Sequence, residues 1–178
     1  MTLQKLLGIE LPIIQAPMAG SQDSALTVAV SNAGGLGSLP CAMLSVDTMC
    51  KELAAIRAQT TKPFNVNFFC HKSPEPAIES ELIWLAALSP YLKEYGIDAS
   101  TISKGPGRVP FSAEVADALR EFSPPIVSFH FGLPAPELVE RLRSWGARIL
   151  SSATTVEEAR WLEARGVDAI IAQGLEAG

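Results

Sequence analysis

The chain has 178 residues, which is enough for one domain with a sizeable hydrophobic core. Hydrophobic residues make up 48% and charged residues 19%, a balance that excludes a disordered protein. The net charge of −5 gives no electrostatic basis for binding nucleic acid or an anionic membrane, and no run reaches the roughly 18 apolar residues of a membrane span. Widely spaced Cys41, Cys50 and Cys70, and an N-terminus without a signal-peptide pattern, predict a cytoplasmic protein without disulfides or a metal site.

Short apolar runs alternate with amphipathic stretches along the chain. Strands are predicted at residues 12–17, 36–39, 63–69, 126–131, 148–152 and 167–172. Helices are predicted at residues 24–32, 45–58 and 136–145. A further helix begins after Thr155, where Glu158 gives the spacing of a capping box. Alternation of this kind, with short connections, indicates an α/β protein with a parallel sheet and right-handed crossovers.

One connection departs from this pattern. Residues 71–110 are too many for a simple connector, and they contain a helical stretch at about residues 79–95. Gly105, Pro106 and Gly107 predict an exposed turn or lid within the same segment. We therefore expect an insertion after the third predicted strand, at the strand ends where insertions commonly serve function.

Two folds are compatible with this order of elements. About six β/α units favour an incomplete (β/α)8 TIM barrel, a fold that typically needs about 250 residues. A doubly wound open sheet of six strands is the alternative, and it would be complete at this length. Hydrophobic periodicity does not separate the two, but in both folds ligands bind at the carboxyl ends of the strands.

Two of the predicted strands carry candidate binding residues. At the exit of the first, Pro17 and Gly20 would let the main chain turn sharply and approach a flat ligand, although a simple turn with a buried Met18 gives the same pattern. In the third, alternation places Asn65 and Asn67 on one face, where buried amides need partners. Asn67 is therefore a candidate ligand contact; the alternative is that both amides bond neighbouring backbone.

Both histidines of the chain follow predicted strands. Histidine is the side chain best suited to proton transfer near neutral pH. His130, flanked by aromatic residues and a glycine, is the stronger candidate for a functional role, whereas for His71 the alternative is that it only lies under the insertion. A structural role is the alternative for each. Cys70 and His71 do not form a metal motif, because further ligands at suitable spacing are missing.

The two glycine-rich segments of the chain differ in polarity. Residues 34–37 lie between a helix and the next strand, which excludes a dinucleotide-binding fingerprint. Residues 173–178 instead follow a strand. There Gly174 and Gly178 would let main-chain N–H groups reach a phosphate or the edge of a flavin.

Five segments that span nearly the whole chain carry a resemblance to a known family. They are residues 11–20 (LPIIQAPMAG), 31–38 (SNAGGLGS), 63–71 (PFNVNFFCH), 128–134 (SFHFGLP) and 167–178 (VDAIIAQGLEAG). In combination they resemble the N-terminal portion of the nitronate monooxygenase family, formerly called 2-nitropropane dioxygenases. The resemblance implies that residues 1–178 form part of a TIM-barrel flavoprotein domain that binds FMN non-covalently.

The resemblance also implies roles for individual residues. His130 would lie in the substrate pocket. In the family, the loop at residues 173–178 continues into a glycine and then the catalytic histidine, which would fall two positions beyond Gly178. FMN contacts are implied for Ala16, Pro17, Met18, Asn67, Gln173 and Gly178.

The reaction implied by the resemblance is oxidation of an alkyl nitronate with O2 to a carbonyl compound and nitrite. Related flavin barrels give the alternative, an NAD(P)H-dependent quinone or enoyl-thioester reductase. A third possibility, of another class, is that the 178-residue chain is a non-catalytic fragment that binds FMN weakly or not at all, because it ends before the catalytic histidine.

Overall fold

The structure, a computed structural model, describes residues 2–72, 75, 77–102 and 109–174. The turn predicted at residues 105–107 and the predicted contact at Gly178 lie outside this part. Internal contacts divide the chain into two compact units, one made of Met1–His71 with Val109–Gly178 and the other of Lys72–Arg108. In the described ranges, no helix is both long and apolar enough to cross a membrane.

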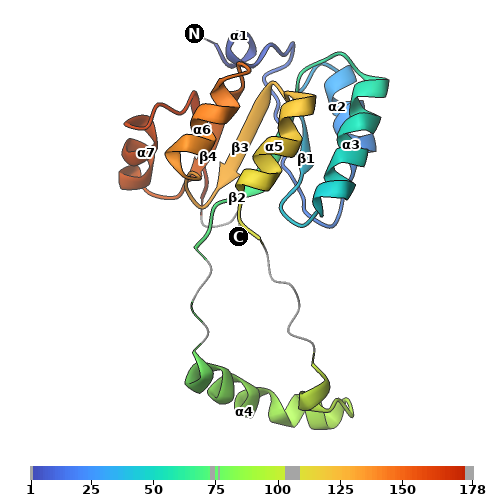
Figure 1. The fold of residues 1–178 in the computed structure, drawn as a ribbon, viewed down its shortest axis with the longest axis vertical. Coiled ribbons are helices and arrows are strands. Elements are labelled where there is room, and N and C mark those ends of the chain that lie inside the picture. Colours follow the sequence, from blue (N-terminus) through green and yellow to red (C-terminus); the bar gives the residue numbers. More distant parts are fainter. Residues whose placement is uncertain (1, 73–74, 76, 103–108, 175–178) are drawn as a thin grey trace. The chain divides into compact units, whose positions relative to one another are not determined.

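The first unit is built on a parallel sheet of five strands (Figure 1). The strands are β1 (Gly37–Pro40), β2 (Phe64–Phe69), β3 (Ile126–His130), β4 (Arg148–Ala153) and β5 (Ala169–Ala172). The helices are α1 (Leu3–Leu7), α2 (Ser24–Asn32), α3 (Val46–Gln59), α5 (Ala113–Phe122), α6 (Pro136–Arg143) and α7 (Val156–Glu163).

The order of the strands decides between the two predicted folds. The strands lie side by side as β1-β2-β3-β4-β5, in the order of the chain. A doubly wound sheet reverses its order at a switch point, whereas the wall of a TIM barrel keeps the chain order throughout. The predicted incomplete TIM barrel is therefore confirmed.

The two faces of the sheet differ because successive side chains point in opposite directions. One face is apolar and is covered by helices. Val66 and Phe68 of β2 pack there with Leu53 of α3 and Leu119 of α5 in a single buried cluster. Asn65 and Asn67 lie on the opposite, inner face, as the alternation predicts.

The inner face changes character along the strands. Where the strands begin it is apolar, and Ile126 and Leu150 pack there with Leu36 and with Leu7 of helix α1. Toward the carboxyl ends, the buried residues of this face become polar. They are Ser38, Asn65, Asn67 and Ser128. Helix α1, which was not predicted, thus closes the apolar end, and the polar end is left for ligands.

The predicted bounds of the strand at residues 12–17 were wrong. Among the described residues this segment forms one isolated bridge, between Ile14 and Leu36. The ladder begins normally, with Gln15 N donating to Leu36 O at 2.9 Å. The next donor would be residue 17, but Pro17 has no N–H. Side-chain amides take over at Ser38: its N–H donates to Gln15 Oε1 at 2.9 Å, and its carbonyl accepts from Gln22 Nε2 at 2.5 Å.

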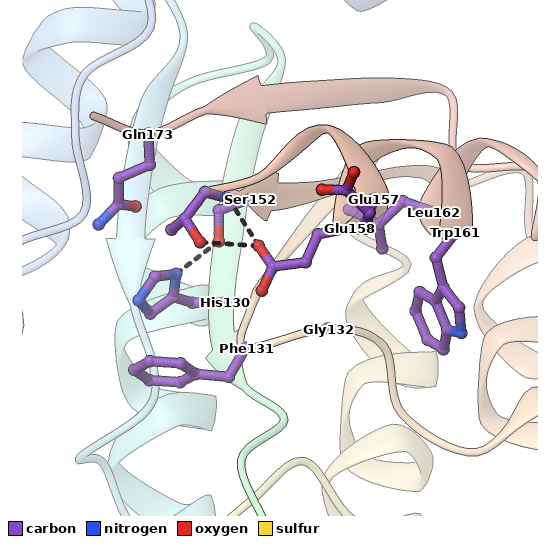
Figure 2. A pocket seen from close by; sticks show the side chains of 10 residues that line it. His130, Phe131, Gly132, Ser152, Glu157, Glu158, Trp161, Leu162 and Gln173 are labelled. Carbon is purple, nitrogen blue, oxygen red and sulfur yellow. Dashed lines mark hydrogen bonds between the residues drawn. The ribbon is translucent and has the colours of Figure 1, made fainter. Parts of the chain in front are cut away.

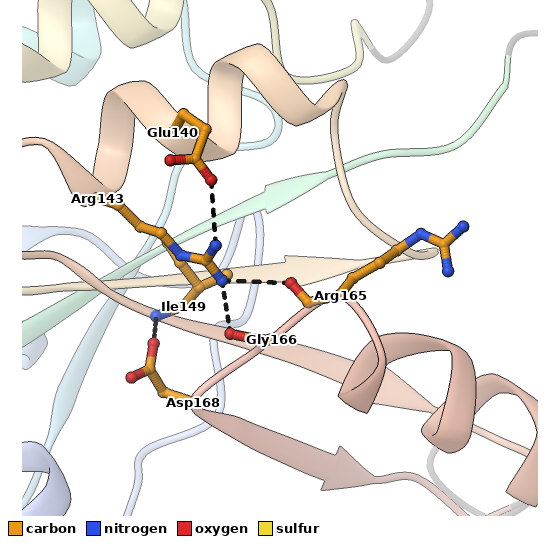
Figure 3. Close-up of polar contacts among 6 residues, drawn as sticks. All are labelled: Glu140, Arg143, Ile149, Arg165, Gly166 and Asp168. Atoms are coloured by element: carbon orange, nitrogen blue, oxygen red, sulfur yellow. Dashed lines mark hydrogen bonds and ion pairs between the residues drawn. The ribbon is translucent and has the colours of Figure 1, made fainter.

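Two further differences arise at element ends. The helix predicted at 136–145 ends at Arg143, because Gly146 takes a left-handed conformation with φ of 85°. The strand predicted at 167–172 begins only at Ala169, because the Asp168 carboxylate accepts from Ile149 N at 2.8 Å (Figure 3). Arg143 strengthens the same corner by donating to Gly166 O at 2.5 Å.

Helix α5 was not predicted at all. Its N-cap Ser112 accepts from Val115 N, and its buried Ala116 and Leu119 are spaced for a helix. The first turn of α5 follows directly on residues 71–110, which were assigned to the insertion. The helical spacing of α5 was therefore overlooked. In the second unit, α4 (Ile78–Glu94) has nearly the bounds of the helix predicted at about residues 79–95. The short 3-10 helix η1 (Ala99–Thr101) follows it.

Gly37 sits where α2 crosses the start of β1. A Cβ at this position would lie 2.0 Å from the carbonyl oxygen of Thr27, so only glycine fits. Gly37 and the preceding Gly34 therefore serve the predicted turn between a helix and a strand, and not a dinucleotide.

We expect Gly37→Ala to destabilise the first unit by about 3 kcal/mol, because the overlap is with backbone that cannot rotate away. Gly20→Ala is the matched control. Gly20 has φ of 81° with nothing within 4 Å of an added Cβ, so only backbone strain of about 1 kcal/mol is expected. Urea unfolding of both variants measures the difference, and equal losses would contradict the close-approach explanation.

Candidate functional site

A cavity of about 730 Å³ opens at the carboxyl ends of β3, β4 and β5 (Figure 2). This volume falls within the roughly 300–1,000 Å³ typical of small-molecule sites. The loop after β3, the end of β4, helix α7 and the residue after β5 all contribute to its wall. The lining residues are His130, Phe131, Gly132, Ser152, Thr154, Glu157, Glu158, Trp161, Leu162 and Gln173.

His130 lies at the end of β3 and is partly buried. Its Nδ1 is 2.5 Å from Oγ of Ser152 on the neighbouring strand β4. Burial lowers the pKa of His130, and the nearby carboxylate of Glu158 opposes that shift. His130 is thus mostly neutral near pH 7, a state in which one ring nitrogen donates a hydrogen bond and the other accepts one.

Phe131 follows His130 in an unusual backbone conformation. Its φ of 67° is in the left-handed region, which is strained for a bulky side chain by about 1–2 kcal/mol. The ring is 54% exposed, and its centroid lies 3.8 Å from that of His130. It also contacts Phe69 and His71 edge-on. The strained turn therefore places an aromatic wall beside His130 at the cavity.

Glu158 contributes to the cavity wall from the first turn of α7. Its carboxylate accepts from Thr154 N at 2.7 Å, from Thr154 Oγ1 at 2.9 Å and from Thr155 N at 3.3 Å. Thr155 in turn accepts from Glu158 N, which confirms the predicted capping box. These bonds lower the pKa of Glu158 and hold a negative charge at a fixed place near His130.

The inner face of the sheet carries a buried amide–hydroxyl network next to β3. Ser128 Oγ accepts from Asn65 Nδ2 at 2.8 Å and from Asn67 Nδ2 at 2.9 Å. Asn65 Nδ2 also donates to Ser38 Oγ at 3.1 Å, so three strands are joined by side chains. Asn67 additionally donates to the backbone carbonyl of Ser128 at 3.3 Å, as the structural alternative for this residue predicts.

The structure brings some of the predicted site residues together and separates others. His130 and Gln173 line the same cavity, and Gly174 follows Gln173 as an exposed residue. Asn67 pairs with Ser128 in the strand register, two residues before His130. The predicted flavin contacts Ala16, Pro17 and Met18 lie beside β1 and do not line this cavity. Met18 is 46% exposed there, against the alternative of a buried methionine.

The sequence of the chain matches the family model for nitronate monooxygenase over residues 1–178. The chain belongs to the nitronate monooxygenase family. A nitronate monooxygenase from Paraburkholderia phytofirmans is 45% identical over 99% of this chain and 48% of its own length. The chain thus spans about half the length of the curated relatives it matches.

Two solved structures resemble the fold. A nitroalkane oxidase from Streptomyces ansochromogenes superposes with a TM-score of 0.82 at 38% identity, over 98% of this chain and 48% of that one. FabK from Thermotoga maritima superposes with a TM-score of 0.70 at 26% identity, over 98% of this chain and 44% of that one. Both likenesses cover nearly all of the present chain and less than half of the other.

Sequence reasoning did not identify three residues that this family member places at the site. Ser128 is a single serine within an apolar strand, and Ser152 is the second of two adjacent serines in β4; only the strand register brings them beside Asn67 and His130. Strand alternation could have placed both on the inner face. Phe131 was noted only as an aromatic neighbour of His130, because its positive φ leaves no signature in the residue type.

Removing the Ser128 hydroxyl tests the buried network. We expect Ser128→Ala to lower the free energy of unfolding by about 2 kcal/mol, because buried amide donors of Asn65 and Asn67 lose an acceptor. The exposed Ser21, whose side chain bonds nothing in the described part of the chain, gives the control Ser21→Ala, expected within about 0.5 kcal/mol of wild type. Denaturant unfolding compares the two, and a neutral Ser128→Ala would exclude this role.

The lowered pKa of His130 gives a pH dependence of stability. On acidification from about pH 7 to about pH 5, the unfolded state takes up the histidine proton before the folded state does. The wild type should therefore lose more stability than His130→Gln over this interval, while both should respond alike above pH 7. Unfolding curves at several pH values measure the difference. Parallel curves would show that the fold imposes no proton penalty on His130.

Proposed function

We propose that the chain supplies flavin- and substrate-facing residues of an FMN-dependent nitronate monooxygenase. In this proposal the enzyme oxidises alkyl nitronates with O2 to a carbonyl compound and nitrite. Membership of the family makes the reaction a reasonable expectation. The observation that supports this reaction at the present site is the position of His130. It is a partly buried imidazole at the carboxyl ends of the strands, in a cavity wall that also holds the apolar side chains of Phe131, Trp161 and Leu162.

The cavity suits a small organic anion. Phe131, Trp161 and Leu162 provide apolar surface for an alkyl chain. His130 offers a ring nitrogen to a nitronate oxygen, and a hydrogen bond to an anion is stronger than one between neutral groups. Glu157 and Glu158 lie on the α7 side of the same cavity. Their negative charges repel an anion, so in this proposal the nitronate binds on the side of the cavity away from α7.

The residues at the carboxyl ends also fit a flavin. A flavin ring is flat and apolar on its faces, with hydrogen-bonding groups along one edge. Asn67 and Gln173 provide amides for such an edge, and the exposed Met18 provides apolar contact for a ring face. Among the described residues the buried Asn65 side-chain oxygen has no hydrogen-bond partner, so the inner face keeps unused hydrogen-bonding capacity close to Asn67.

The protein would contribute binding, orientation and exclusion of water. Ala16, Pro17, Met18, Asn67, Gln173, Gly174 and Gly178 are the residues proposed to hold FMN. When bound, FMN supplies the electron transfer that oxidises the nitronate. His130 would bind the nitro group and stabilise its negative charge, while the aromatic wall at Phe131 limits the access of water.

Binding of FMN tests the cofactor part of the proposal. In a fluorescence titration of the 178-residue chain, extended to millimolar concentrations, we expect Asn67→Ala to weaken the Kd for FMN about tenfold, which corresponds to about 1.4 kcal/mol. Asn32→Ala is the matched control, because Asn32 is exposed at the end of α2 and should leave the Kd unchanged. Equal affinities of the two variants would remove Asn67 from the flavin site. No binding by the unmodified chain would favour the non-catalytic alternative.

Substrate use tests the reaction. With FMN present, we expect a protein that contains residues 1–178 together with the catalytic histidine implied by the family resemblance to consume oxygen on propionate 3-nitronate and to show little NADH oxidation with a quinone. The opposite result would overturn the proposal in favour of the NAD(P)H-dependent reductase alternative.

A further inference from the structure

The contact between Ser152 and His130 bears on which ring nitrogen carries a proton. Ser152 Oγ lies 2.5 Å from Nδ1, and within the described residues this is the only hydrogen bond of the Ser152 side chain. A hydroxyl that donates needs an acceptor, and here the acceptor within reach is Nδ1. If Nδ1 carried the proton, the hydroxyl would accept from it, and the hydroxyl's own proton would have no acceptor among the described residues; donation from Ser152 to Nδ1 satisfies more hydrogen-bonding groups. With that direction, the proton of the neutral imidazole resides on Nε2.

We propose that Ser152 is a positioning residue that fixes His130 as the Nε2–H tautomer and so presents an N–H donor at the cavity. The hydrogen bond joins the ends of adjacent strands, and the Phe131 ring packs against the imidazole at a centroid distance of 3.8 Å. These two contacts hold the ring in one orientation (Figure 2). The role of the donor in catalysis rests on the proposed function, but the tautomer itself does not.

A serine suits this position better than a carboxylate would. A carboxylate can only accept, so it would place the proton on Nδ1 and leave Nε2 as an acceptor, which is the arrangement of a general base. The serine hydroxyl can donate to Nδ1 of the neutral ring and accept from Nδ1–H of the protonated ring. His130 therefore keeps an Nε2–H donor in both protonation states, which suits the binding of an anion and does not suit proton abstraction by Nε2.

In the part of the chain that the structure describes, the charged and titratable groups around the ring do not supply an alternative partner for Nδ1. Glu158, the nearest carboxylate on α7, is engaged by Thr154 and Thr155. Glu157 lies on the same helix at the cavity wall, and His71 contacts the Phe131 ring. Ser152 is thus the residue on which the tautomer depends.

The experiment is a long-range 1H–15N correlation spectrum of the 178-residue chain with 15N-labelled histidine, recorded above the pKa of His130. The chain has only two histidines, so His130→Gln assigns the signals. We expect the pattern of a single Nε2–H tautomer for His130 in the wild type. In Ser152→Ala the two ring nitrogens should shift toward the averaged values of a mixed population, and Ser152→Thr, which keeps the hydroxyl, should restore the wild-type pattern.

His71 serves as the internal reference, because its signals should not change in either Ser152 variant. A Nδ1–H pattern in the wild type would overturn the proposal. So would a His130 pattern that is the same in Ser152→Ala as in the wild type, and so would equal effects of the alanine and threonine variants. The spectrum needs neither flavin nor substrate. A lack of nitronate activity would therefore contradict the proposed function but not the tautomer assignment. A different tautomer would contradict the role of Ser152 but not the proposed function.

Discussion

The hydroxyl group of Ser128 accepts hydrogen bonds from the side-chain amides of both Asn65 and Asn67, and much of the inner face depends on it. Amides buried on a central strand are costly unless they are paired. Pairing them through a residue of the adjacent strand fixes the β2–β3 register by side chains as well as by backbone. The same register sets Phe69 beside His130, so the buried network and the cavity wall are aligned together.

Much of this architecture was accessible from the sequence, and the missing parts have a common cause. Alternation placed Asn65 and Asn67 on one face, and strand exits identified His130 and the segment at Gln173. Periodicity alone did not predict that the strands pair in chain order, because it reports the face of a strand and not its neighbours; the family resemblance implied the barrel. Ser152 was missed for the same reason, since its partner lies 22 positions away in the chain. The position of the Phe131 ring could not be predicted, because it depends on a positive φ that phenylalanine does not favour.

The site combines a hydrogen-bonded network on the inner face of the sheet with a strained backbone turn at Phe131. Beneath the cavity, side chains bond across strands and leave little room for movement. At its edge, Phe131 is held at positive φ by Gly132, which is itself left-handed, and by the bond from Ser151 Oγ to the Gly132 carbonyl at 2.8 Å. Such strain persists only where the surroundings compensate for it. Here the compensation comes from β4, the strand that also provides Ser152, so one strand supports both the histidine and its aromatic neighbour.

Pro17 interrupts the first parallel ladder, and Gln15 and Gln22 complete it with side chains. Beyond Ile14, the outward N–H and carbonyl of Ser38 are therefore already occupied, although no strand formed by the described residues lies beside them. An unpaired strand edge invites another polypeptide to add to it, which leads to aggregation. Two glutamine side chains thus act as a cover that blocks β-strand addition at this edge, while the main chain at Pro17 and Met18 is released from the sheet.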